Sequence, residues 1–393
     1  MKVTKIEVFH VHKRKSTGQR PIIIKVDTDE GISGLGEVGL AYGAAGHAGA
    51  AVIKDLAQYV LGRDPFDTER VWNDFLTQTF WGQGGGTVLF SGISAIDTAL
   101  WDIKAKSLGV PLYKLLGGKV QEDLRVYASQ IQFTWNEPER RMLTRTEEYA
   151  ASAQKAVSEG YDCVKVDVLA VDKDGNKITT TRGAIPYEII KLGAERVRAI
   201  REAIGENVDI IVENHGNTDT ESGIEFAKAI EEYRILYYEE INTPLNAKLT
   251  KLAKEKINIP LAAGERIYSR YGYLPFLEDR SLDLLQPDIG SCGGISEFKK
   301  ISDAAFIYDV GIQAHVAGTA IAEAVAVNAE ISIPNFVIHE HHQKAFLDEY
   351  RELVTVDYQP VNGRYKPLET PGVGIDITPY VYSHSDRFEV GRA

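Results

Sequence analysis

The sequence predicts an α/β protein in which an N-terminal α+β module precedes a closed barrel of alternating strands and helices. Two observations favour this class. After residue 123, short apolar runs alternate with amphipathic helical segments, which is the pattern of βαβ units that build a parallel sheet. Eight such runs occur, at a spacing that favours a closed, TIM-like barrel over an open doubly wound sheet. No GxGxxG motif follows the first strand, which argues against a dinucleotide-binding fold.

The first 123 residues form the predicted α+β capping module. It opens with two strands, KIEVFHVH and PIIIKVDT, followed by a turn at DEG. The pattern then becomes helical from about residue 50 to residue 116, most clearly in SGISAIDTALWDIKAKSLG. Apolar residues recur there at helical spacing, at Ile93, Ile96, Leu100 and Ile103. Gly117 and Gly118 are expected to end the helical region.

Residues 124–365 are predicted to form the barrel, and residues 366–393 a C-terminal segment. The eight predicted strands are LRVYAS, DCVKVDVL, DIIVEN, LYYEEI, PLAAGE, LDLLQPD, IQAHV and FVIHEH. Segments such as EYAASAQKAVSEG, AERVRAIREAIG and GIEFAKAIEEY read as the helices between them. One connection is long, and its KDGNKITTTRGAIP stretch reads as a loop inserted beside the site.

Composition restricts the class of protein. The chain has 393 residues, 44% hydrophobic and 25% charged, as is ordinary for a globular protein. Its net charge of −12 argues against binding to nucleic acid or to an anionic membrane surface. The N-terminus carries no long apolar segment. Only Cys163 and Cys292 are present, which indicates a reducing compartment, so we expect a cytoplasmic protein.

Ionisable residues stand at the ends of seven successive predicted strands. Because the carboxyl ends of barrel strands meet at one opening, these side chains should converge where barrel enzymes keep their chemistry. From Glu213 onward, the steps between them are 26, 26, 23, 27 and 25 residues, one strand–helix unit each. A single ionisable residue at a strand end would be interpreted as a solvated loop residue. Seven of them in register are not explained in that way. The members of this series are Lys165 with Asp167, Glu213, Glu239, Glu265, Asp288, His315 and Glu340.

Three of these residues are predicted to bind a metal ion. Glu213, Glu239 and Glu265 offer three carboxylates and no thiolate, which favours a hard cation, and Mg²⁺ above all. Buried together, they need a cation or protons for compensation. His215 is an alternative fourth ligand for Zn²⁺, but we interpret it as an acid/base group.

The neighbouring residues suggest proton transfer. Asp288 and His315 end adjacent strands, and a carboxylate beside a histidine fixes its tautomer and raises its basicity, as a general base requires. Lys165 faces the same opening, where it could neutralise a substrate carboxylate or stabilise developing negative charge.

Several motifs of the sequence resemble those of a known family. The motifs fall in order over almost the whole chain: SAIDTALWDIKAK, PLYKLLGGK, YYEEINTP, IPLAAGERIYSR, LDLLQPDIGSCGGISE, HVAGTAIAEAVA and PLETPGVGIDI. They resemble the mandelate racemase subgroup of the enolase superfamily, and within it the acid-sugar dehydratases. The resemblance implies a (β/α)₇β barrel with an N-terminal α+β capping domain that the C-terminal segment completes. It also implies an even-numbered homo-oligomer, from dimer to octamer.

The resemblance further implies a chemistry. One Mg²⁺ per subunit, held by Glu213, Glu239 and Glu265, would bind the carboxylate of a sugar acid and stabilise an enediolate. His315, oriented by Asp288, would take the C2 proton, and His215 would protonate the departing 3-hydroxyl. Glu340 would hydrogen-bond the substrate carboxylate with support from Lys165. The product would be a 2-keto-3-deoxy acid.

The chain departs from the family pattern at two site positions. Glu213 stands where relatives usually have Asp, and Asp167 where racemases carry a second lysine and galactonate enzymes an asparagine. Asp167 cannot be that lysine, which argues against racemisation through two bases, and it adds negative charge unless Lys165 pairs with it. These departures leave the identity of the sugar acid open.

Further substrate contacts are expected outside the strand ends. Residues 40–50, LAYGAAGHAGA, read as a mobile lid that sets substrate size, with Tyr42 or His47 touching the substrate. Trp81, in the cap turn WGQGGG, and Arg266, next to the third metal ligand, are further candidates, together with Asp167. His341 and His342 are interpreted as exposed loop residues.

Three functions are compatible with these residues. The first is Mg²⁺-dependent dehydration of an aldonate or aldarate. The second is racemisation, epimerisation or cycloisomerisation of a carboxylate through the same enediolate. The third is non-catalytic binding of a sugar acid, which the change to Glu213 makes conceivable.

Overall fold

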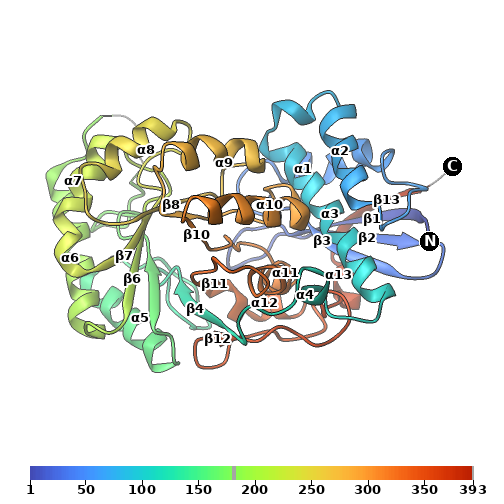
Figure 1. The fold of residues 1–393 in the computed structure, drawn as a ribbon. Coiled ribbons are helices and arrows are strands. Elements are labelled where there is room, and N and C mark those ends of the chain that lie inside the picture. The colour runs from blue at the N-terminus through green and yellow to red at the C-terminus, as the bar shows by residue number, and fades with distance from the viewer. Residues whose placement is uncertain (179–182, 392–393) are drawn as a thin grey trace.

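An antiparallel cap and a parallel barrel lie side by side in the computed structural model, which describes residues 1–178 and 183–391 (Figure 1). The cap sheet has the order β13-β1-β2-β3, built from β1 (Val3–Val11), β2 (Ile22–Thr28), β3 (Ser33–Glu37) and β13 (Ser385–Gly391). Its helices are α1 (Gly46–Ala57), α2 (Thr68–Gln78), α3 (Thr87–Ser107) and the short α4 (Leu112–Leu115). The sequence patterns indicated β1 and β2 but not β3.

The missed strand β3 explains how α3 packs in the cap. Its sequence, SGLGE, lacks the apolar alternation of a typical strand because glycines face the helix. A Cβ on Gly34 would lie 2.1 Å from the carbonyl oxygen of Ala99, and one on Gly36 would lie 2.0 Å from that of Ala95. Only glycine permits this close approach, which buries the apolar face of α3, including Ile96 and Ile103.

The barrel strands form a parallel sheet that curls back on itself. They follow the sheet order β10-β9-β8-β7-β6-β5-β4-β11. Hydrogen bonds from Ile312 N to Asn335 O and from Val337 N to Ile312 O join β10 to the segment that leads into β11. The strands are β4 (Leu124–Ser129), β5 (Cys163–Val166), β6 (Asp209–Glu213), β7 (Ile235–Glu239), β8 (Leu261–Ala263), β9 (Leu284–Leu285), β10 (Gly311–Ile312) and β11 (His339–His342).

One helix follows each barrel strand from β4 to β10, so the (β/α)₇β architecture with an N-terminal cap is confirmed. Each helix buries an apolar stripe against the strands; in α6 the stripe includes Ile190, Val197 and Ile200. Polar side chains fix several helix starts, as where Asp219 accepts from Ser222 N at the head of α7. The helices are α5 (Thr146–Ser158), α6 (Tyr187–Ile204), α7 (Thr220–Ile230), α8 (Ala247–Lys254), α9 (Ser269–Glu278), α10 (Gly294–Ile307) and α11 (Ala320–Glu330).

The cap is seated on the loops that follow two barrel strands. Glu37, at the end of β3, accepts hydrogen bonds from the backbone N–H (3.0 Å) and hydroxyl (2.8 Å) of Thr319. Gly39 N donates to Gly290 O at 2.9 Å. Asp97 of α3 accepts from Ser296 N at 2.9 Å and from its hydroxyl at 2.6 Å. These contacts hold the cap sheet beside the mouth formed by the strand ends.

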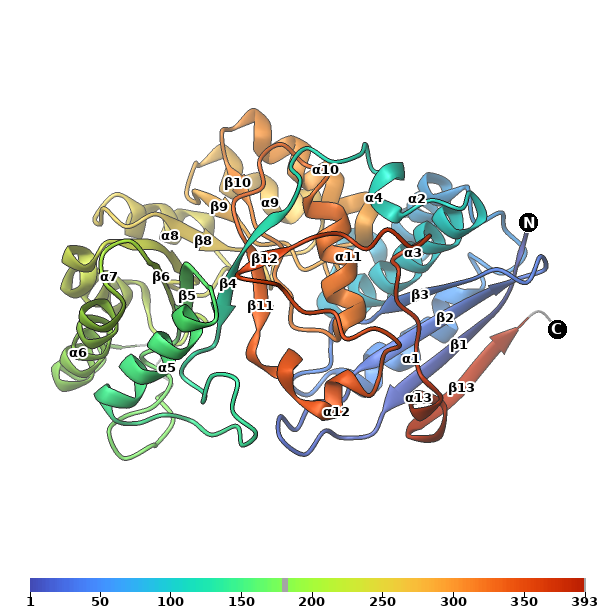
Figure 2. The same cartoon turned by 90° about the horizontal axis from the view of Figure 1, so that it is seen from below.

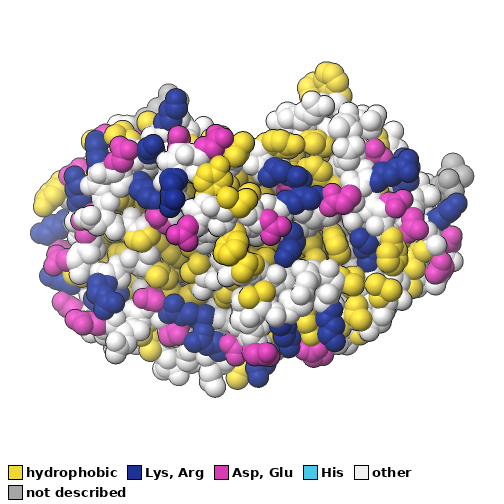
Figure 3. Space-filling view, in the orientation of Figure 1, with side chains coloured by type: hydrophobic (Ala, Val, Ile, Leu, Met, Phe, Trp, Pro, Cys, Tyr) yellow, Lys and Arg dark blue, Asp and Glu magenta, His cyan; other side chains and the backbone are white. Residues whose placement is uncertain are grey.

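The chain ends in the cap rather than in the barrel. After β11 it passes through α12 (Asp348–Arg351), β12 (Arg364–Tyr365) and α13 (Pro379–Ser383), and β13 then pairs with β1 (Figure 2). The domain limits at residues 123 and 365 stay predictions. Among the described residues, no helix has the length and apolarity needed to cross a membrane. On the face drawn in Figure 3, acidic and basic side chains are interspersed and neither sign dominates.

Candidate active site

Three glutamates meet at the carboxyl ends of adjacent barrel strands. Glu213 ends β6, Glu239 ends β7, and Glu265 follows β8 by two residues. One carboxylate oxygen from each lies within 4.8 Å of those of the other two. Burial raises the pKa of Glu239 to about 8 and also raises that of Glu213. The sequence-predicted metal ligands are therefore brought together in a low-dielectric site.

Lys165 of β5 is the ammonium group at the centre of this cluster. Its Nζ lies 2.8 Å from Glu340 Oε1, 3.1 Å from Glu239 Oε2 and 3.4 Å from Glu213 Oε2. Although burial opposes it, these carboxylates raise the pKa of Lys165 well above its usual value, so it stays charged. Lys165 therefore does not pair with Asp167, the pairing that the sequence had left open.

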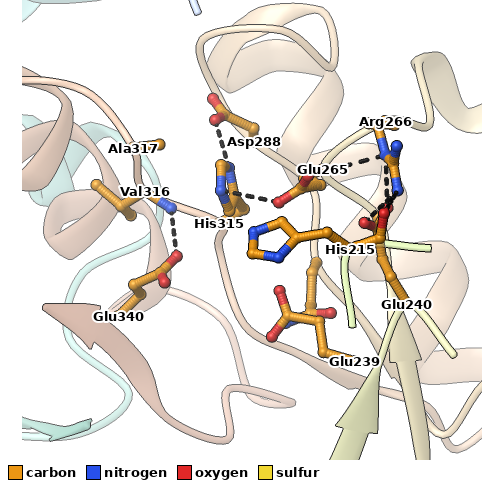
Figure 4. Close-up of polar contacts among 12 residues, drawn as sticks. His215, Glu239, Glu240, Glu265, Arg266, Asp288, His315, Val316, Ala317 and Glu340 are labelled. Carbon is orange, nitrogen blue, oxygen red and sulfur yellow. Dashed lines mark hydrogen bonds and ion pairs between the residues drawn. The ribbon is translucent and has the colours of Figure 1, made fainter. Parts of the chain in front are cut away.

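His315 lies between two carboxylates at the mouth. Its Nδ1 is 2.7 Å from Asp288 Oδ2 and its Nε2 is 3.0 Å from Glu265 Oε2 (Figure 4). Although burial opposes it, Glu265 and Asp288 raise the pKa of His315 to about 10. The structure thus places the predicted base and its orienting carboxylate in direct contact.

His215 forms a second chain of the same composition. Its Nδ1 is 3.0 Å from Asp167 Oδ2 and its Nε2 is 3.1 Å from Glu213 Oε1. Although burial opposes it, Glu213 and Asp167 raise the pKa of His215 well above its usual value. The sequence did not reveal this partner for Asp167, although Asp167 and His215 follow neighbouring strands, which is the signal that could have found it.

Glu340 of β11 accepts three hydrogen bonds from the protein. They come from the Ser129 hydroxyl (2.6 Å), Val316 N (2.9 Å) and Lys165 Nζ (2.8 Å). Despite its burial, Lys165 and His315 hold the pKa of Glu340 below its usual range. As an ionised acceptor it fixes Lys165 and the loop after His315, while its expected contact with the substrate carboxylate stays a prediction. No sequence pattern indicated a role for Ser129.

The other expected substrate contacts lie around the mouth and in the cap. Arg266 pairs with Glu240, with its Nε 3.0 Å from Glu240 Oε1, and donates to His215 O at 2.8 Å (Figure 4). Tyr42 is 74% exposed on the loop after β3. His47 belongs to α1, which begins at Gly46, and packs edge-on against His10 in the cap. Trp81 is exposed and packs edge-on against Phe80. Their contacts with substrate stay predictions.

Two histidines at the end of β11 differ from the sequence expectation. His341 and His342 are buried rather than exposed, because β11 continues through His342, which pairs with Ser129 of β4. His341 stacks on Tyr161, and its Nδ1 lies 2.7 Å from the Tyr161 hydroxyl. The expected inserted loop runs from residue 173 to 186, and its residues 179–182 lie outside the described part of the chain.

The donor set and the charge balance fit a hard divalent cation. Six carboxylates occupy the cluster, against one ammonium and two imidazoles, so negative charge exceeds positive by three when every carboxylate is ionised and both imidazoles are protonated. Crowded buried carboxylates need a compensating cation, and oxygen ligands select a hard one. Those six are Asp167, Glu213, Glu239, Glu265, Asp288 and Glu340. The imidazoles of His215 and His315 flank the three metal-ligand candidates. The ligand atoms that converge are those of the three glutamates, so the geometry does not favour Zn²⁺ ligation by His215.

A carboxylate cluster with two aspartate-held histidines, at the mouth of a capped barrel, defines a barrel enzyme. Comparison with known proteins agrees. Residues 3–117 match the mandelate racemase / muconate lactonizing enzyme N-terminal domain, and residues 148–381 match the enolase C-terminal domain-like family. The chain belongs to the mandelate racemase / muconate lactonizing enzyme group of the enolase superfamily. It is an enzyme rather than a non-catalytic binding protein.

Individual relatives cover almost the whole chain. A D-galactonate dehydratase of Pectobacterium atrosepticum is 31% identical over 96% of this chain and 92% of its own length. A protein from Zymomonas mobilis ZM4, provisionally named a dehydratase, has a crystal structure with TM-score 0.98 and 62% identity over the full length of both chains. An enolase superfamily member from Salmonella Typhimurium gives TM-score 0.96 and 49% identity over 99% of both chains.

Proposed function

We propose that this enzyme dehydrates a sugar acid, an aldonate or aldarate, to a 2-keto-3-deoxy acid with the help of Mg²⁺. The observation that carries the proposal is the pair of Asp–His–Glu chains on the two sides of one carboxylate cluster. Loss of water from a sugar acid needs one group that removes the C2 proton and another that protonates the leaving 3-hydroxyl. The 31% identity with D-galactonate dehydratases supports the same reaction class.

Mg²⁺, when held by Glu213, Glu239 and Glu265, supplies the positive charge that makes a proton beside a carboxylate acidic enough to remove. In its neutral form His315 takes the C2 proton at Nε2, while Asp288 holds Nδ1–H and fixes the ring. His215, held in the same way by Asp167, donates from Nε2 to the leaving hydroxyl. Lys165, kept charged and immobile by Glu340, stabilises the negative charge that develops at the substrate carboxylate.

Glu340 acts in this proposal through Lys165 rather than on the substrate. An ionised carboxylate would repel the carboxylate of a sugar acid, whereas its three hydrogen bonds position the ammonium and the loop after His315. This differs from the role that the family resemblance implied for it.

One observation favours a second candidate, epimerisation at C2. The two histidines are held alike, and two acid/base groups on opposite faces are what an epimerase needs. Against it, dehydration explains both histidines and agrees with the named relatives.

The experiment incubates the Mg²⁺-loaded enzyme with a panel of C5 and C6 aldonates and aldarates in D₂O. Keto-acid formation and deuterium at C2 are measured together. We expect at least one acid to yield a keto acid, and EDTA to abolish the reaction. Deuterium entering recovered substrate or its C2 epimer, without keto acid, would replace dehydration by epimerisation.

A further inference from the structure

An unpaired arginine lies where the loop after β4 approaches the cap. The Arg140 guanidinium sits 3.3 Å from the centre of the Phe133 ring. Its Nε is buried without a hydrogen-bond partner, and within residues 1–178 and 183–391 it forms no ion pair with a carboxylate. Burial lowers the pKa of Arg140 to about 10, opposed only by the phenols of Tyr350 and Tyr42. An arginine placed in this way has its charge available for a ligand.

A buried lysine reaches the same junction from the end of β11. Lys344 is 2% exposed, and its Nζ donates to Gln19 Oε1 of the cap at 3.1 Å and to the carbonyl of Ala317. Ala317 is two residues beyond His315, so this ammonium lies beside the catalytic loop. Burial lowers the pKa of Lys344 to about 8, although the charges of Glu37, Glu323 and Glu340 oppose this shift.

The carboxylates nearest to Lys344 are engaged elsewhere. Glu340 pairs with Lys165, Glu323 pairs with His339, and Glu37 accepts from Thr319. Arg140 and Lys344, which we call the junction cations, therefore form no direct ion pair with a carboxylate of the described chain. Desolvated cations without a paired carboxylate are costly, and an anion bound between them would offset that cost.

Lys344 ties the junction to the loop that carries His315, through the carbonyl of Ala317. The charges of Lys344 and Arg140 act on the buried His342, as do those of Glu340 and Lys165, so both the junction and the metal end lie near this imidazole. The wall is completed by Tyr350, whose hydroxyl donates to the same Gln19 Oε1 at 2.7 Å, and by Tyr42 at the opening.

We propose that Arg140 and Lys344 bind a second anionic group at the far end of the substrate. The substrate is then a sugar acid with an anionic group at each end, which we call a dianion for short: either an aldarate with a terminal carboxylate or an aldonate with a terminal phosphate. This inference rests on the proposed function, in which the first carboxylate binds at the metal end beside Lys165. Planar, bidentate binding by Arg140 suits either terminal group.

The test compares three forms of each sugar acid: the aldonate, the aldarate and the terminally phosphorylated aldonate, galactonate and its two derivatives among them. With Mg²⁺-loaded enzyme we expect kcat/KM for at least one dianion to exceed that for its aldonate by about 100-fold, the worth of a buried charge pair. The preferred arm distinguishes a terminal carboxylate from a terminal phosphate, and either supports the inference.

Variants of Arg140 and Lys344 test whether these two residues cause the preference for the dianion. Arg140→Gln should raise KM for the dianion by about 30- to 1,000-fold with little change in kcat, and leave the aldonate within about threefold, since the contact is remote from the reacting atoms. Arg140→Lys should recover part of the loss. The matched control is Arg141→Gln, because Arg141 is exposed and pairs with Glu148 at 2.9 Å. Lys344→Gln provides a second test if Arg140→Gln does not fold.

A calorimetric measurement separates this inference from the proposed function. His315→Asn enzyme, which holds the ligand without turnover, should bind the aldarate or phosphorylated acid more tightly than the aldonate, and Arg140→Gln should remove the difference. Turnover of aldonates that equals or exceeds that of both dianions overturns the inference and leaves the proposed function standing. Absence of turnover and C2 exchange with every acid contradicts the proposed function, while calorimetry still decides whether the junction cations bind anions.

Discussion

The two Asp–His–Glu chains at the barrel mouth use the same residue types in the same order. In each, an aspartate contacts Nδ1 and a metal-ligand candidate contacts Nε2. They differ in how the chain holds them. His315 forms a parallel bridge with Asp288, and cap contacts at Gly290 and Thr319 flank both residues. His215 lies beyond β6 in a left-handed turn, with φ of 50°.

Exposure separates the two chains further. The His215 side chain is 33% exposed although Asp167 and Glu213 are almost fully buried, whereas the three members of the His315 chain are each 15% or 16% exposed. A base that removes a carbon-bound proton needs a fixed position, which barrel and cap give to His315. An acid that meets a leaving hydroxyl needs a buried anchor and an accessible ring, which describes His215. Similar chemistry in unlike settings therefore supports unlike roles.

Replacing each histidine by asparagine should break the comparison most clearly. His315→Asn should lower both C2 deuterium exchange and keto-acid formation by about 10³- to 10⁴-fold, because the base is lost. His215→Asn should lower keto-acid formation by a similar factor and leave C2 exchange near the wild-type rate. Both rates come from one NMR time course in D₂O.

The opposite split would reassign the two roles, and equal loss of exchange in both variants would favour a two-base epimerase. Far-ultraviolet circular dichroism and Mg²⁺ binding of both variants serve as controls for folding and for an intact carboxylate cluster.

The aspartates should repeat this split with a smaller effect. Asp288→Asn and Asp167→Asn should each cost about 10- to 100-fold, since an amide misorients the imidazole without removing it. Asp288→Asn should slow exchange and dehydration together, and Asp167→Asn dehydration alone. Asp174→Asn, in the exposed loop after β5, is the matched control. Unchanged rates in Asp167→Asn would show that His215 does not depend on this partner.

The metal site gives the third test, in which the free energy of unfolding is measured. Mg²⁺ at 100 times its dissociation constant should stabilise the wild type by about 2.7 kcal/mol through linkage. Glu239→Gln should lose this stabilisation, because one of three ligands is gone. In EDTA its free energy of unfolding should stay within about 1 kcal/mol of wild type, since the amide removes charge from an overcharged cluster. Thermal melts across a Mg²⁺ titration measure both, and full stabilisation of Glu239→Gln would exclude Glu239 as a ligand.

Much of the site could be predicted because the spacing of ionisable residues along the chain indicates which strand ends hold them. One strand–helix unit per ionisable residue placed Glu213, Glu239 and Glu265 at adjacent strand ends, and adjacency of the next two strands paired Asp288 with His315. The pairing of Asp167 with His215 depends on a left-handed turn after β6, and hydrophobic periodicity carries no information about such a turn.

The parts of the fold that were missed depend on tertiary contacts, which leave no pattern in the local sequence. Strand β3 owes its glycines to the approach of α3, a tertiary constraint that outweighs strand propensity. The burial of His341 and His342 follows from two further residues of pairing between β11 and β4, and polar residues at the end of a strand read equally well as a loop. The junction cations come from segments 204 residues apart, and no pattern along the chain joins them.

A third histidine held by two carboxylates supplies an effect that is spread over several pH units, and an internal reference for the two at the mouth. His339 is fully buried, with Nδ1 beside Glu330 at 2.5 Å and Nε2 beside Glu323 at 3.0 Å. Although burial opposes it, Glu330 and Glu323 raise the pKa of His339 from 6.5 to about 10. Because the unfolded chain releases this proton near pH 6.5, the stabilisation is complete below that pH and is lost as the pH rises toward 10. The free energy of unfolding should fall by up to about 1.4 kcal/mol per pH unit.

Urea unfolding of the Mg²⁺-loaded enzyme between pH 6.5 and 9.5 measures this slope. Glu330→Gln, with one carboxylate left, should shift the decline to lower pH, whereas an identical profile in that variant would assign the slope to other groups.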